Sequence, residues 1–225
     1  FYKVVYIFSM KKITTEKHPD TIPVFPLSNF IIFPEITVPL NIFEPRYINM
    51  VDDCMKKSRI IGMIQPKEKL GTTNPSLYEV GCAGKITSFT ETEDGRYLIV
   101  LNGISRFKTV KEIENGKLYR EFNVNFDEYQ NDTIEKKEDI KFSDVELIFK
   151  NLKNLFKKNG YMIDWKEFEK QSLDYTINTL SIASPFSLEE KQALLETKSL
   201  EKRKSKLQEI LNTYMLDSFR NTTIQ

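Results

Sequence analysis

The sequence predicts an α+β protein in which a strand-rich region with one helix precedes a helical region. Three observations support this fold class. Residues 21–129 contain six runs rich in apolar and β-branched residues, and one amphipathic stripe at helical spacing lies among them. From Ser143 onward, apolar residues recur at helical spacing behind serines suited to helix capping. A polar, charge-mixed stretch at 130–139 separates the two patterns.

The first strand, at 22–27, contains two prolines. Proline fixes φ and has no N–H to donate, so Pro23 and Pro26 place this strand at a sheet edge or give it an interrupted ladder. Pro34 then holds the residue before it in an extended conformation and turns the chain before the second strand, at 36–43.

A helix is predicted at Pro45–Lys57. Proline suits the first helical turn, where its missing N–H costs nothing, and Phe43 or Glu44 is then the cap. Arg46 in that turn opposes the positive end of the helix dipole. We therefore expect it to pair with a carboxylate on a strand, with Tyr47 packed beneath it. The apolar stripe consists of Tyr47, Met50, Val51, Cys54 and Met55.

The remaining strands are predicted at 60–64, 78–90, 97–110 and 119–129. Asp94-Gly95 indicates a type I′ turn, which pairs the strand at 78–90 with the strand at 97–110. Gly81 and Gly84 predict a bulge or a sharp bend in the first of these.

The second region is predicted to be a helical bundle. Ser143 and Ser187 each precede a glutamate by three residues, the capping-box spacing that marks a helix start. A third helix carries Leu173 and Ile177 and ends at Pro185, and a last one spans Leu200 to Tyr214.

These motifs, in this order, resemble the N-terminal substrate-binding domain of Lon proteases. The resemblance covers IPVFPLSNFIIFPEITVPLNIFEPRY at 22–47, GCAGKI at 81–86, GRY at 95–97 with GISRF at 103–107, and EKQALLE at 190–196. It implies a small, distorted β-barrel of the pseudouridine-synthase-associated (PUA-like) type with one packed helix. The residues that match the family motif are Pro23, Pro26, Pro34, Pro39, Phe43, Glu44, Pro45, Arg46, Tyr47, Gly81, Gly84, Gly95, Gly103, Arg106 and Phe107.

The predicted organisation has four parts: a poorly ordered tail at 1–20, a LON-type domain at 21–130, a linker at 131–142 and a helical subdomain at 143–220. Phe1 is not an initiating residue, so Met10 is a candidate start. The polar residues before Gln225 slightly favour a natural stop there.

Composition describes a packed globular protein that recognises its partner locally. The 225 residues include 33 Lys and Arg against 32 Asp and Glu, so no global field favours nucleic acid or a membrane surface. The basic run at 202–206 is interleaved with glutamates and is expected to be a solvated helix face. With two cysteines and no secretory signal, we expect a cytoplasmic location.

No catalytic or cofactor-binding constellation is predicted. No two of the eight glycines have the spacing of a P-loop, so ATP hydrolysis is not expected. His18 is the only histidine, which excludes a Ser-His-Asp triad, and we expect it to be solvated. Cys54 and Cys82 are expected to be small buried residues. No cofactor or metal site is expected, and the ATPase and Ser-Lys peptidase domains of Lon are not found.

Binding is therefore argued from apolar surface. The run Phe30–Phe33 is apolar throughout, and a strand cannot bury all of its residues on one face. We expect Phe30, Ile32 and Phe33 to contact substrate, although a helix covering the second face is an equal alternative. A second route is addition of an extended client strand to an edge near 22–27.

Three functions remain open. The preferred one is a non-catalytic module that binds exposed apolar segments of unfolded or damaged proteins, with a role as adaptor to a separate ATP-dependent protease. The second is the N-terminal fragment of a complete ATP-dependent Lon serine protease, which a longer reading frame would reveal. The third is a small-ligand or RNA-binding module on the same barrel, which requires a deep pocket ringed by basic residues.

Overall fold

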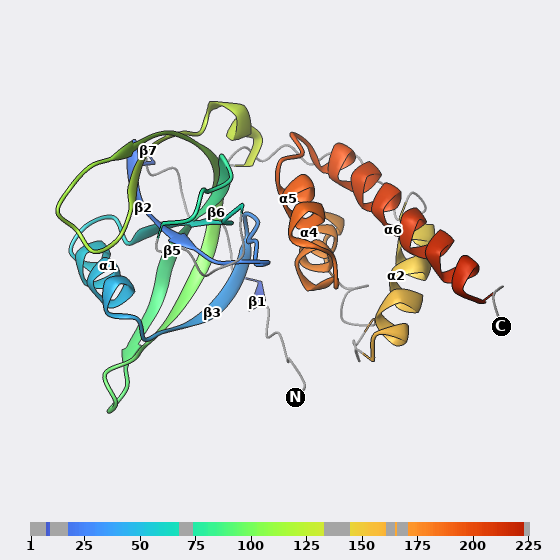
Figure 1. Cartoon of the computed structure of the whole chain (residues 1–225), viewed down its shortest axis with the longest axis horizontal. Helices are drawn as coiled ribbons and strands as arrows, with labels where there is room; N and C mark the ends of the chain where they lie inside the picture. Colours follow the sequence, from blue (N-terminus) through green and yellow to red (C-terminus); the bar gives the residue numbers. More distant parts are fainter. Residues whose placement is uncertain are drawn as a thin grey trace. The chain divides into compact units, whose positions relative to one another are not determined.

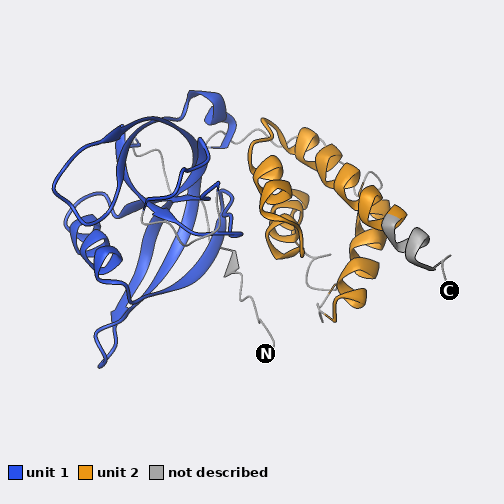
Figure 2. Ribbon diagram, in the orientation of Figure 1, with its two compact units in different colours: residues 1–135 blue, residues 136–225 orange. Residues whose placement is uncertain are grey.

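The structure is a computed structural model that describes residues 8–9, 18–67, 74–132, 145–160, 165 and 171–222. Two compact units divide the chain, at 1–135 and 136–225 (Figure 2). The boundary between them falls within the segment predicted as a linker. Each unit is described separately below.

The described residues of the first unit form a seven-stranded mixed sheet and one α-helix; Figure 1 shows their arrangement. This arrangement confirms the predicted α+β class. Along the sheet the order is β1-β3-β6-β5-β4-β2-β7, and β7 also pairs with β6, so five strands form a closed ring of pairings. The strands are β1 (Phe8–Ser9), β2 (Thr21–Pro26), β3 (Ile36–Ile42), β4 (Ile60–Ile64), β5 (Val80–Glu91), β6 (Tyr97–Ile113) and β7 (Glu121–Asn125).

Strand β2 has the interrupted ladder that its prolines predict. Its first half pairs antiparallel with β7 and its second half pairs parallel with β4. The strand therefore lies between two neighbours, and the alternative of a free sheet edge is wrong. In addition, Phe8–Ser9 pairs with β3, so part of the predicted tail is a strand.

The β5–β6 hairpin is confirmed, but its turn differs from the prediction. The Gly95 N–H donates to the Thr92 carbonyl, and the Thr92 N–H donates to the Arg96 carbonyl, both at 2.9 Å. Gly95 has a φ of +76°, whereas Asp94 has no positive φ. A type I′ turn needs positive φ at both central residues. The loop is instead a wider turn closed by a left-handed glycine.

Phe107 fills the interior of the strand ring, and a glycine makes room for it. A Cβ on Gly81 would lie 2.6 Å from the Phe107 ring, so only glycine fits there. The register shift predicted for this strand occurs between Ala83 and Gly84. Around Phe107 the core consists of Ile22, Val24, Ile60, Ile64, Ala83, Phe122 and Val124.

Helix α1 (Pro45–Met55) starts behind Glu44, one of the two predicted cap residues. The predicted stripe is buried at Tyr47, Met50, Val51 and Cys54, and Met55 is half-buried. Two tyrosines hydrogen-bond the polar side of this helix to the rest of the first unit. The hydroxyl of Tyr97 donates to Asp52 at 3.0 Å, and that of Tyr119 donates to Asp53 at 2.7 Å.

The chain leaves the sheet through a 3-10 segment, η1 (Asp127–Asp132), where a longer strand was predicted. Arg106 fixes this segment to β6. Its guanidinium donates to Asp132 at 2.7 and 2.9 Å and lies 4.3 Å from the Tyr129 ring centroid. Both charged side chains are largely buried. The pair therefore positions the end of the first unit, and this gives the matched family motif residue Arg106 a structural role.

The described part of the second unit is helical, with α2 (Glu146–Lys158), α4 (Leu173–Ala183), α5 (Leu188–Leu195) and α6 (Leu200–Thr222). Helix α6 contacts the other three. Ser187 caps α5 in a complete capping box, as predicted. At α2 the N-cap is Val145, without a side-chain cap, and Ser143 lies outside the described residues.

The basic run on α6 only partly matches the prediction. Lys204 and Lys206 pair with the neighbouring glutamates Glu201 and Glu209, as expected of a solvated face. Arg203, in contrast, is buried, and its guanidinium donates to the side-chain oxygen of Asn178 at 2.7 Å. Its Nε also donates to the Leu194 carbonyl at 3.3 Å, so the run contributes buried polar contacts to the helical unit.

Candidate functional site

The expected client-binding residues do not form an exposed patch. Ile32 and Phe33 are 1% and 0% exposed, and Phe30 is half-buried. The run is a loop between β2 and β3, so strand alternation does not apply to it and successive side chains can all face inward. Its backbone packs against β6: a Cβ on Gly103 would lie 2.1 Å from the Phe33 carbonyl oxygen. The expectation of exposure was wrong for Ile32 and Phe33.

Exposed apolar side chains occur instead on the outer face of β3 and β6. The register places Asn41 opposite Leu98, and Pro39 opposite Val100. Leu98 is 46% exposed, Pro39 is exposed and Val100 is half-buried. Phe43, directly after β3, is 63% exposed. We refer to Pro39, Phe43, Leu98 and Val100 as the outer apolar patch.

Sequence reasoning missed this patch although the signal was present. Tyr97 to Leu101 is a run of five apolar residues on a strand, and alternation must turn some of them outward. Tyr97, Ile99 and Leu101 are buried, whereas Leu98 and Val100 lie on the opposite face. The argument that failed for Phe30–Phe33 holds here because this run is a strand. Among the patch residues, Pro39 was identified as a family motif residue, and Phe43 as a family motif residue and a candidate helix cap.

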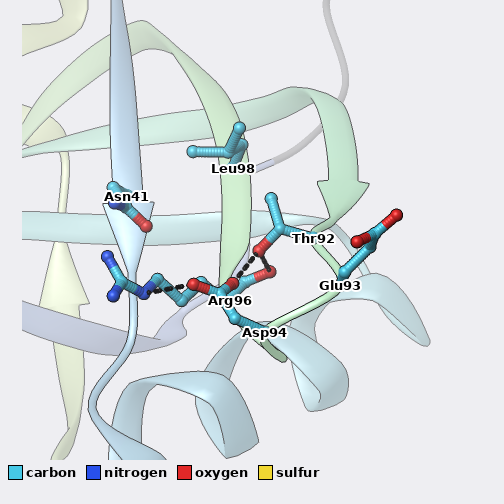
Figure 3. A pocket seen from close by; sticks show the side chains of 6 residues that line it. All are labelled: Asn41, Thr92, Glu93, Asp94, Arg96 and Leu98. Atoms are coloured by element: carbon cyan, nitrogen blue, oxygen red, sulfur yellow. Dashed lines mark hydrogen bonds and ion pairs between the residues drawn. The ribbon is translucent and has the colours of Figure 1, made fainter.

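A shallow depression of about 540 Å³ adjoins the patch (Figure 3). Leu98 and Asn41 form one side, and residues of the β5–β6 turn form the other. Figure 3 shows the guanidinium of Arg96 below Asn41, with its Nε 3.0 Å from Asp94. The lining residues are Asn41, Thr92, Glu93, Asp94, Arg96 and Leu98.

The turn beside the depression is held by its own polar contacts. The Thr92 hydroxyl donates to the Asp94 carboxylate and lies 3.0 Å from the Arg96 carbonyl oxygen. The bond from Thr92, together with the nearby Arg96 charge, lowers the pKa of Asp94. Asp94 is therefore a stable anion at neutral pH, and its charge is matched by Arg96.

The Arg46 pairing differs from the prediction. Its partner is Glu44, at 2.8 Å, rather than a strand carboxylate. Tyr47 does pack beneath the guanidinium, 4.6 Å from ring centroid to Cζ. Both charged side chains are more than two-fifths exposed. The pair lies at the start of α1. Glu44 is the N-cap residue, two positions before Arg46, so its carboxylate is within reach of the guanidinium.

The two cysteines are buried and the histidine is half-buried. Cys54 and Cys82 are free and buried, as predicted, and burial raises the pKa of the Cys54 thiol to about 12. The thiol therefore stays protonated at neutral pH. His18 is half-buried against Phe126, at 4.7 Å between ring centroids, and burial lowers its pKa, so the expected solvated histidine was wrong.

Neither a metal-binding cluster nor a membrane-spanning helix occurs among the described residues. Within them, no group of three or more His, Cys, Asp or Glu is arranged to hold a metal ion. In the same part of the chain, no helix has both the length and the apolarity needed to cross a membrane.

Most of this chain is similar to known proteins. The sequence model of the ATP-dependent protease La (LON) substrate-binding domain matches residues 21–213. The Lon protease of Dictyoglomus thermophilum is 24% identical over 206 residues, which are 86% of this chain and 24% of that protein. The Lon protease of Parabacteroides distasonis is 34% identical over 96 residues, 41% of this chain and 12% of its own length. In the most extensive of these matches, the chain spans about a quarter of the relative's length.

Solved structures support the same fold. A Lon N-terminal domain protein from Xanthomonas campestris superimposes with a TM-score of 0.59 at 19% identity, covering 85% of this chain and 97% of that one. The N-terminal domain of the Mycobacterium avium complex Lon protease gives the same TM-score at 15% identity, with 85% and 98% covered. Together with the match over residues 21–213, these findings show that the chain belongs to the Lon substrate-binding domain family.

Proposed function

We propose that this protein is a protein-recognition module that binds exposed apolar segments of unfolded or damaged polypeptides through the outer apolar patch. The observation that carries the proposal is an accessible apolar surface, centred on Leu98 and Phe43, in a chain of the substrate-binding family. Exposed apolar clusters on globular proteins mark interaction sites. An extended segment can lie across the strands here and place alternate side chains on the patch.

The chemistry around the patch favours polypeptide over the small-ligand or RNA alternative. The depression is shallow and lined by two carboxylates and one guanidinium, rather than ringed by basic residues. Nucleic acid would require a surplus of positive charge to neutralise its phosphates. The proposal therefore includes no nucleic-acid partner and no cofactor.

Two settings for this module are compatible with the comparisons. In the first, the chain works alone as a non-catalytic adaptor to a separate protease. In the second, the same module is the N-terminal part of an ATP-dependent Lon protease, which agrees with relatives about four times as long. Sequencing the reading frame beyond Gln225 distinguishes them. We place either form in the cytoplasm, where free thiols such as Cys54 and Cys82 persist.

Two features of the fold also form part of this proposal. We take the closed ring of strand pairings to be a small, distorted barrel, and the helices of the second unit to be a bundle that follows it. In this arrangement the ring supplies a rigid platform, and the β5–β6 hairpin carries the binding face beyond it.

The test is a fluorescence-anisotropy titration of the purified chain into a labelled, permanently unfolded polypeptide, with the folded form of that polypeptide as the control. Saturable binding to the unfolded form alone is the expected result. Binding to neither form, or equal binding to both, would refute client recognition.

A further inference from the structure

We infer that the outer apolar patch selects segments in which an apolar residue is flanked by lysine or arginine. This inference rests on the proposed function, since it names the class of client that the same site prefers. The observation behind it is the charge of the hairpin next to Leu98. Two carboxylates, Glu93 and Asp94, line the depression beside Leu98 with a single cation, Arg96.

The negative charge of this hairpin is only partly neutralised. Asp94 pairs with Arg96 at 3.0 Å. Glu93 is exposed and has no ion-pair partner among the residues that the structure describes. The hairpin therefore offers one unpaired carboxylate beside an apolar surface.

The position of Glu93 suits a flanking cation. Glu93 and Leu98 line the same depression. Glu91, opposite the buried Tyr97, lies on the other face of the sheet and takes no part. A bound strand that rests an apolar side chain on Leu98 brings a residue about two to three positions away to the turn, at roughly 3.3 Å per residue. A cation there meets Glu93, and an anion is repelled by it.

Surface ion pairs are individually weak, so the expected effect is selectivity rather than strong binding. Each exposed pair contributes about 0.2–1 kcal/mol. One such pair, together with the repulsion of an acidic flank, gives an expected preference of about 2- to 5-fold for basic over acidic flanks at low salt. Screening should reduce this preference as the salt concentration rises.

The experiment compares three labelled, unstructured peptides that share one apolar core and carry Lys, Ser or Glu flanks. Anisotropy titrations should rank their affinities Lys, Ser and then Glu, with the differences shrinking in high salt. The Glu93→Lys variant should abolish or reverse the ranking. Glu114→Lys makes the same charge change at an exposed position just beyond the opposite end of β6 and should leave the ranking intact.

The outcomes separate this inference from the proposed function. Equal affinity for all three peptides, with binding present, would overturn charge selection and leave client binding standing. Equal effects of Glu93→Lys and Glu114→Lys would show that the preference follows the net charge of the protein and not the position of Glu93. That result would also overturn the inference. Failure of every peptide to bind would refute the proposed function itself. Circular dichroism of each variant establishes that the fold is retained.

Discussion

Two apolar runs of the first unit, Phe30–Phe33 and Tyr97–Leu101, differ in how many of their side chains are buried. The first is a loop whose last three residues are buried, and the second is a strand that buries every other residue. A strand has a side-chain period of two, whereas a loop has none. Backbone conformation, rather than apolar composition, therefore decides which run presents an exposed apolar surface.

The largest expected effect comes from truncating the buried run. Phe33→Ala removes a fully buried ring and should lower the free energy of unfolding by about 3–5 kcal/mol. Leu98→Ala, on the exposed side of the second run, should cost less than about 1 kcal/mol. Urea titration of both variants measures the difference. Equal losses would break the contrast between the two runs.

The close approach of the first run to β6 gives the next effect. Phe33 passes so near Gly103 that an added Cβ would lie 2.1 Å from its carbonyl oxygen, so the loop must shift in Gly103→Ala. We expect a loss of roughly 1–3 kcal/mol from this overpacking. Gly116→Ala is the matched control, because nothing lies within 4 Å of the position of its Cβ. A Gly103→Ala variant as stable as this control would contradict the packing described.

Stability at alkaline pH should depend on Cys54, on the buried side of α1. The pKa of Cys54 is about 12 in the folded protein and about 8.5 in an unfolded chain. Between these values the unfolded state loses its proton first, so stability is unaffected below about pH 8.5 and falls as the pH rises, by up to about 1.4 kcal/mol per pH unit. Denaturant titrations at pH 8 and pH 10 should show a smaller loss for Cys54→Ala than for the native chain. An identical loss of stability in both proteins would show that Cys54 does not cause it.

The smallest effect is expected at Arg46. Its pair with Glu44 is half-exposed, so Arg46→Ala should cost about 0.5 kcal/mol in stability and leave client affinity unchanged. Thermal melting and the anisotropy titration together measure both quantities. A loss of affinity without a loss of stability would show that Arg46 contacts clients.

Much of the local structure was predictable because its signals are local. The Ser187 capping box, the start of α1 at Pro45 and the pairing across the Asp94-Gly95 turn each depend on residues a few positions apart. The fold class followed from the same patterns. Their local nature explains why the family motifs could be recognised in one sequence.

What could not be predicted depends on contacts between distant residues. The position of β2 between β4 and β7 arises from closure of the strand ring, which no local pattern encodes. Burial of Ile32 and Phe33 depends on the distant Gly103. The exposure of Ile32 and Phe33 was mispredicted for this reason, since exposure is a property of the folded unit.

The most direct test of the central claim is client affinity after polar substitution of the outer apolar patch. Phe43→Ser combined with Leu98→Ser should weaken binding of the unfolded polypeptide at least about fivefold, in line with the loss of roughly 1 kcal/mol or more of apolar contact. Leu118→Ser, at a side chain that is 64% exposed in the loop between β6 and β7, should leave the affinity unchanged. Unchanged binding by the folded double variant, or an equal loss in Leu118→Ser, would contradict the assignment of this patch.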